Sequence, residues 1–108
     1  MNLQEIQTAA QKIWPFDESS YPALAHLSPE DRQTFALKHV LTHLTKAVGR
    51  IAGAVEPLDH GEELDKNAIR IALRKVIVDA VQSAGIAGIT SKELEEEIMR
   101  WQHESDTA

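Results

Sequence analysis

The sequence predicts an all-α domain, and three observations support this class. Apolar residues recur at the three- and four-residue spacing of a helix over residues 28–55 and again over residues 65–84. Residues that cap helices precede these repeats, and no stretch alternates apolar and polar residues as a strand does. With 108 residues the chain has the length of one domain, so we expect a single antiparallel bundle of four to five helices over residues 1–108.

The first predicted helix runs from Asn2 to Ile13. Asn2 and Glu5 hold the positions of a capping box, and Pro15 disfavours helix at Trp14, where the helix is expected to end. The connection that follows is long for a compact domain. Its apolar residues are therefore expected to pack across the core, and they are Trp14, Phe16, Tyr21 and Leu24.

The longest predicted helix starts after the cap residue Ser28 and stops near Glu56, before Pro57. At ~1.5 Å per residue it is roughly 40 Å long, so it requires partners along its whole length. Its apolar positions predict one buried face made of Leu37, Val40, Leu41, Leu44, Ala47, Val48, Ile51 and Val55.

An acidic loop is expected from Pro57 to Asp65, followed by a helix from Asp65 to about Ala84 that Gly85 ends as a C-cap. The apolar face of this helix is wide, which indicates contact with more than one neighbour. Thr90 and Glu93 form a capping box for a last helix, and residues 102–108 are expected to fray. The wide faces of the two central helices exceed what one small chain can cover, so we predict a homodimer or a larger homo-oligomer.

Composition limits the classes of function. The chain has no cysteine and a formal net charge of −6, which excludes disulfides and disfavours non-specific nucleic-acid binding. A helix-turn-helix cadence over residues 85–94 would place Glu93 and Glu95–Glu97 near the DNA phosphates, so we interpret it as a structural corner. No stretch resembles a signal peptide or a membrane span, and we expect a cytoplasmic protein with no membrane partner.

Four basic side chains lie on one stripe of the longest helix: His39, His43, Lys46 and Arg50. Two histidines at i and i+4 are a known spacing for metal ligands, and the cations could hold an anion such as phosphate. A third interpretation is a solvated face opposite acidic residues of the last helix or of a partner.

Two segments resemble motifs of the MazG-like, all-α nucleoside-triphosphate pyrophosphohydrolases. Residues 44–52 (LTKAVGRIA) are similar to that family's Glu-Glu-hydrophobic-Gly-Glu-Leu-Ala segment. Residues 75–81 (KVIVDAV) are similar to its Glu-Glu-hydrophobic-Gly/Ala-Asp-hydrophobic segment. The order of the predicted helices, the opening residues 3–6 and the closing residues 89–94 also fit, so the resemblance covers most of the chain.

The resemblance implies a MazG-like fold and a site in which an ExxE pair and an ExxD pair hold magnesium. By position these pairs fall on Ala47 with Arg50 and on Val76 with Asp79, so Asp79 is the only family acid retained. Magnesium needs several oxygen ligands, and we therefore expect no metal and no cofactor.

Asp79 borders the apolar stripe of its helix, so it is expected to be partly buried and to need a partner. We predict an ion pair between Asp79 and Arg50 where the family holds metal, with Lys46 and Lys75 nearby. The candidate binding residues are therefore Lys46, Arg50, Lys75, Asp79 and His43.

Three functions stay open at this stage. The preferred one is a relative that has lost catalysis and binds a partner or a phosphate-bearing ligand such as a nucleotide. The second is an active pyrophosphohydrolase that uses magnesium, with Asp79 joined by Glu62, Glu63 or Asp65. The third is a helical partner protein that binds no ligand.

Overall fold

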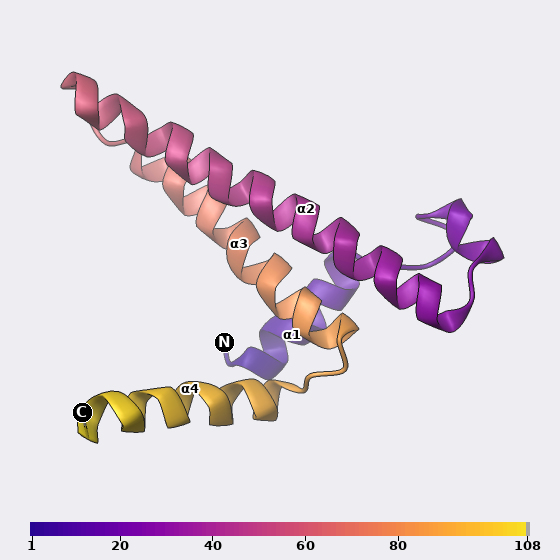
Figure 1. Cartoon of the computed structure of the whole chain (residues 1–108). Helices are drawn as coiled ribbons and strands as arrows, with labels where there is room; N and C mark the ends of the chain where they lie inside the picture. The colour runs from indigo at the N-terminus through magenta and orange to yellow at the C-terminus, as the bar shows by residue number, and fades with distance from the viewer. Residues whose placement is uncertain (108) are drawn as a thin grey trace.

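The computed structural model describes residues 1–107, and within them every regular element is helical (Figure 1). In chain order the elements are α1 (Leu3–Ile13), the 3₁₀ helix η1 (Pro22–His26), α2 (Pro29–Val55), the 3₁₀ helix η2 (Glu56–His60), α3 (Lys66–Ile86) and α4 (Ser91–Thr107). The all-α prediction is confirmed.

The centre of the molecule is an antiparallel hairpin of α2 and α3, which run side by side along their lengths (Figure 1). Ser28 caps α2 by accepting a hydrogen bond from the Asp31 amide at 3.1 Å, and Asp65 caps α3 by accepting one from the Ala68 amide at 3.0 Å. The residues buried between the helices are mostly small, which lets the two backbones approach closely. They include Ala36, Val40, Ala47 and Ala72.

Helix α1 packs across the C-terminal half of α3 (Figure 1). Gln7 Nε2 donates to the Ile89 carbonyl at 3.3 Å, and the expected capping box of Asn2 and Glu5 is present. Gly85 permits this close packing, because a Cβ there would lie 3.2 Å from Gln7 Nε2. The prediction that Gly85 ends its helix was wrong: α3 continues to Ile86, and Gly88 adopts the positive φ of 80°.

The connection between α1 and α2 packs against α2, as predicted. Its aromatic rings join two histidines of α2 in one cluster, which we call the aromatic cluster: Trp14, Phe16, Tyr21, Phe35, His39 and His43. His39 and His43 are both half-buried. The interpretation of the histidine stripe as a solvated face is therefore wrong for these two residues, because aromatic rings cover them.

The single buried face predicted for α2 is also wrong in part. Helix α3 covers only the sector that carries Val40 and Ala47, whereas Leu41 and Val48 remain 61% and 51% exposed. Residues are spaced by about 100° around a helix, which puts the exposed apolar stripes of the antiparallel α2 and α3 on the same side of the hairpin. We call this surface the open apolar side, and it carries Leu41, Leu44, Val48, Ile51 and Val55 of α2 with Ile69, Leu73, Val76 and Ile77 of α3.

Helix α4 leaves the body beside α1 and diverges from the hairpin (Figure 1). Its start is held by Ser91 Oγ, which donates to Gln4 Oε1 at 2.8 Å. The prediction of fraying from residue 102 was wrong, because α4 is helical to Thr107; residue 108 lies outside the described residues. The ion pair of Arg100 with Glu97 at 2.7 Å supports the helix near its middle.

The molecule is open for its size. The radius of gyration is 16.9 Å, against roughly 13 Å for a compact domain of this length. The accessible surface is 7881 Å², against roughly 6,000 Å² for a compact monomer of this mass. Within the described residues, none of the helices has the length and apolar character needed to cross a membrane.

Candidate functional site

The most unusual buried group is the carboxylate of Asp79, which is fully buried where α3 faces α2. Lys75 Nζ donates to Asp79 Oδ1 at 2.7 Å. Asp79 Oδ2 is also buried and has no hydrogen-bond partner among residues 1–107. A buried carboxylate with only one of its two oxygens satisfied costs folding free energy, and such groups in native proteins often have a functional reason.

The sequence produces this pair because Lys75 and Asp79 are four residues apart on α3 and so lie on one helix face. The Lys75 ammonium also lies 4.4 Å from the centroid of the Trp14 ring, in cation–π contact. Trp14 itself is fixed at both ends: Gln82 Nε2 donates to its carbonyl at 2.9 Å, and its indole nitrogen donates to the Tyr21 hydroxyl at 2.5 Å. Lys75 is therefore held between a buried anion and an immobilised ring.

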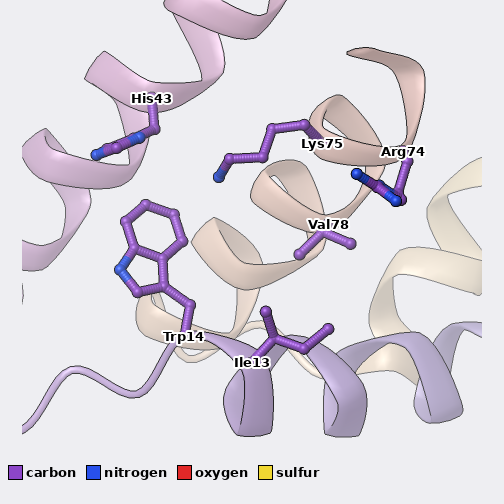
Figure 2. Close-up of a pocket in the computed structure, with 6 residues that line it drawn as sticks. All are labelled: Ile13, Trp14, His43, Arg74, Lys75 and Val78. Carbon is purple, nitrogen blue, oxygen red and sulfur yellow. The ribbon is translucent and has the colours of Figure 1, made fainter. Parts of the chain in front are cut away.

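His43 of α2 lies beside Lys75 and Trp14 (Figure 2), with its ring centroid 4.8 Å from that of Trp14. Burial lowers the pKa of His43 below its ordinary value, and the positive charge of Lys75 lowers it further. His39 and Lys46 act in the same direction, while Asp79 opposes them. The neutral imidazole is therefore favoured at pH 7.

A pocket of about 490 Å³ opens beside these residues (Figure 2). It is lined by Ile13, Trp14, His43, Arg74, Lys75 and Val78. In Figure 2 the Lys75 side chain points into the space between His43 and Trp14, with Arg74 and Val78 on the same helix. The pocket thus combines apolar walls with two permanent cations.

A second pocket of about 340 Å³ shares Arg74 and Lys75 with the first and extends along the hairpin. Its other lining residues are Arg50, Ala68, Ile71 and Ala72. We call the two together the basic groove. It lies on the opposite side of the hairpin from the open apolar side, because His43, Arg50 and Lys75 fall on the opposite edges of their helices.

The structure unites some of the predicted site residues. His43, Lys75 and Asp79 lie together, and Arg50 lines the far part of the groove. Lys46 is exposed but close enough to act on the pKa of His43.

The predicted ion pair of Arg50 with Asp79 was wrong, because Asp79 pairs with Lys75. Lys75 stands one turn away on the same helix, whereas Arg50 lies beside Ala68 and Ala72, which are roughly 10 to 16 Å along α3 from Asp79.

Among the aromatic and charged residues that line the groove, Trp14 and Arg74 were not predicted as site residues. Trp14 had been assigned to core packing, and Arg74 was not singled out. The spacing of Lys75 and Asp79 was visible in the sequence and would have identified their pairing. No sequence signal relates Trp14 to Lys75, since they are brought together only when α1 crosses α3.

The groove does not offer the ligands that magnesium requires. Of the four positions that the resemblance assigned to metal ligands, Ala47, Arg50 and Val76 have no carboxylate, and the Asp79 carboxylate is bonded to Lys75. Asp65 caps the start of α3, about 21 Å along the helix from Asp79, so the relocated set proposed from the sequence does not assemble. Within residues 1–107, no three side chains of the His, Cys, Asp or Glu type are grouped as a metal site.

The chain was compared with known protein families, curated proteins and solved structures. None of the three comparisons gave a match.

Proposed function

We propose that this protein is a MazG-like relative that has lost metal-dependent catalysis and binds a phosphate-bearing ligand, such as a nucleotide, in the basic groove. The observation that carries the proposal is the sharing of Arg74 and Lys75 by two adjoining pockets, with Trp14 at one end and Arg50 at the other.

The chemistry of the groove fits a ligand with an anionic part and an apolar part. Guanidinium groups bind phosphate oxygens through paired hydrogen bonds, and an ammonium adds a mobile point charge. Ile13, Trp14 and Val78 provide apolar walls for the rest of the ligand. Asp79 repels an anion little, because its charge is buried and balanced by Lys75.

Loss of catalysis follows from the same residues. Pyrophosphohydrolysis in the family depends on magnesium ions that orient the triphosphate and a water molecule. A buried Asp79 held by Lys75 and an Arg50 at a ligand position favour an anion over a divalent cation.

We also propose that two copies associate through the open apolar side to complete a helical bundle. The accessible surface exceeds that of a compact monomer by roughly 1,900 Å². The footprint of the hairpin is about 30 Å by 20 Å, or roughly 600 Å², which approaches the ~800 Å² per partner of a standard interface.

Titration calorimetry with a panel of nucleoside triphosphates tests the ligand proposal. We expect binding without divalent metal, and we expect Arg50→Ala or Arg74→Ala to weaken it about tenfold, since each removes a charged hydrogen-bond donor. Arg70→Ala is the matched control, because Arg70 is exposed on α3 and lines neither pocket of the groove. Absence of binding by every nucleotide would leave only the partner-protein function.

An assay of pyrophosphate release with magnesium or manganese tests the loss of catalysis. We expect no release above the blank. Turnover that Asp79→Asn abolishes would overturn this part of the proposal and would leave the binding result standing.

A further inference from the structure

Helix α4 carries an apolar stripe that its own chain leaves uncovered. Leu94, Ile98 and Trp101 follow the i, i+4, i+7 spacing of one helix face. Within the described part of the chain, α1 is the main packing partner of α4, and the contact is at the start of the helix. Beyond that contact Ile98 is 54% and Trp101 70% exposed.

The flanks of this stripe are acidic. Glu97 and Glu104 are seven residues apart along one edge, and Glu95 lies on the other edge. In total α4 carries six acidic residues and two basic ones, which are Glu93, Glu95, Glu96, Glu97, Glu104 and Asp106 against Lys92 and Arg100. The helix is therefore an acidic amphipathic helix with a tryptophan at the C-terminal end of its apolar stripe.

The hairpin carries the opposite charge. Residues 32–55 and 66–78 contain no acidic residue and eight basic ones, which are Arg32, Lys38, Lys46, Arg50, Lys66, Arg70, Arg74 and Lys75. Three of these eight line the Arg50 end of the basic groove, whose floor is made of Ala68, Ile71 and Ala72. Ile71 is 46% exposed there, so this floor offers apolar surface.

The two surfaces also match in length. Ala68 to Lys75 spans about 10 Å of α3, and Leu94 to Trp101 spans about 10 Å of α4. A tryptophan seated in an apolar depression and surrounded by charged pairs is a typical centre of binding energy in protein interfaces. Apolar contact and complementary charge thus point to the same pairing.

We propose that α4 of one copy docks into the Arg50 end of the basic groove of a second copy. Trp101 packs on Ile71, and the α4 carboxylates face Arg50 and Arg74. A second copy is the occupant because α4 of the same chain diverges from the hairpin (Figure 1), with its start tied to α1 by Ser91 and Gln4. This docking does not depend on ligand binding, but it uses Arg74 and Lys75, so a bound anion is expected to compete with α4.

The absence of cysteine makes a proximity test direct. Ser105→Cys places a thiol on the apolar stripe of α4 and keeps Trp101, and Ala68→Cys places one on the floor of the groove. The two single variants are mixed and treated with a short bismaleimide. We expect a cross-linked heterodimer at least about fivefold above the yield with Met99→Cys, which lies on another face of α4.

Three results would overturn the proposal. One is a Ser105–Ala68 yield no higher than that of the Met99 control. Another is cross-linking that occurs only within one chain of a Ser105→Cys/Ala68→Cys double variant, which would mean that α4 closes on its own groove. The third is an unchanged yield when Glu97→Lys and Glu104→Lys are added, because we expect these reversals to lower it about tenfold.

The test is independent of the other proposals. Blocking the open apolar side with Leu41→Glu leaves the Ser105 and Ala68 positions intact, so the cross-link persists if only the apolar dimer fails. If the protein binds no nucleotide, the cross-link is still expected to form. If the cross-link does not form, calorimetry still tests nucleotide binding on its own.

Discussion

Lys75 makes two contacts at once, an ion pair with Asp79 and a cation–π contact with Trp14, although its side chain is still 36% exposed. The ion pair supplies the hydrogen bond to Asp79 Oδ1, whereas the Trp14 ring also contacts Phe16 and His43. Because Asp79 is fully buried, removing Lys75 leaves its charge without the ammonium group that balances it. The stability of the site therefore rests on this lysine more than on any other side chain of the groove.

Lys75→Met is expected to destabilise the fold by roughly 2–3 kcal/mol, because it leaves a buried carboxylate unpaired. The double variant Lys75→Met/Asp79→Leu is expected to recover most of this loss, since two apolar groups of similar size replace the pair. Urea unfolding of the wild type, the two single variants and the double variant measures the coupling. A double variant as unstable as Lys75→Met would contradict this account of the pair.

The lowered pKa of His43 predicts a pH dependence of stability. The unfolded chain binds a proton on His43 at about pH 6.5, whereas the folded protein does so only at lower pH. The free energy of unfolding is therefore expected to fall as the pH decreases below about 6.5. Comparing urea unfolding at about pH 7.5 and pH 5.5 measures this loss, which His43→Gln should reduce and His103→Gln, at an exposed position of α4, should not.

At this scale the burial of Asp79 could be predicted from the sequence, and the i,i+4 spacing offered Lys75 as a partner, but the exclusion of Arg50 could not be predicted. Burial follows from the position of Asp79 beside an apolar stripe, which is a local property of the helix. The choice between Lys75 and Arg50 depends on how far α2 and α3 are shifted along each other, and no local pattern encodes that shift. The contact of Trp14 with Lys75 could not be predicted either, because it also depends on how the helices pack against each other.

Among the elements, α2 combines a strong start with interior positions of low helix propensity. Ser28, Pro29 and Asp31 define its N-terminus, whereas Gly49 and Gly53 lie inside it. A Cβ added at either glycine meets no atom within 4 Å. Neither glycine is therefore required by packing within one chain.

Gly49→Ala is expected to stabilise the fold by about 0.5–1 kcal/mol, because alanine restricts the unfolded chain and fits a helical backbone. Gly88→Ala is the opposing control, since Gly88 has a φ of 80° and a side chain there costs roughly 1 kcal/mol or more. Thermal unfolding of both variants checks the sign of each effect. Destabilisation by Gly49→Ala would indicate that Gly49 packs closely against another copy.

The existence and order of the helices could be predicted from the sequence, because capping residues and apolar spacing are local. Which face of each helix is buried could not be predicted from the sequence. Leu41 and Val48 fit the spacing that predicted one buried face on α2, yet both are exposed. They are exposed because a single neighbouring helix covers only part of the circumference of α2. The full length of α4 was missed because its polar end was interpreted as a tail; the ion pairs of Lys92 with Glu96 and of Arg100 with Glu97 support the helix only before residue 102.

For the whole molecule, the extended shape and the surplus of accessible surface agree with a chain that has further surfaces to cover. The open apolar side and the stripe of α4 account for much of the exposed apolar area. Their positions on different parts of the molecule allow the two proposed self-contacts to form independently.

Leu41→Glu/Val48→Glu is expected to convert the proposed apolar dimer into monomers without loss of helix, because both side chains are exposed on the open apolar side. Sedimentation velocity over a range of concentrations measures the association, and circular dichroism measures the helix content. Thr42→Glu is the control, because it adds one carboxylate to α2 outside that side, and it is compared with Leu41→Glu alone. A wild type that stays monomeric at every concentration would contradict the dimer.

The attachment of Trp14 at the very end of α1 couples the groove to the opening of that helix. The Trp14 amide donates to the Ala10 carbonyl of the last turn, Gln82 holds the Trp14 carbonyl, and Tyr21 accepts from the indole nitrogen, so fraying of that turn is expected to release one wall of the pocket. A molecule bound against this wall would raise the free energy of opening in proportion to RT ln(1 + [L]/Kd). Slower amide exchange in α1 would then report that the basic groove is occupied, although the charged groups of the groove belong to α2 and α3. Helix α1 is the shortest of the four α-helices described here.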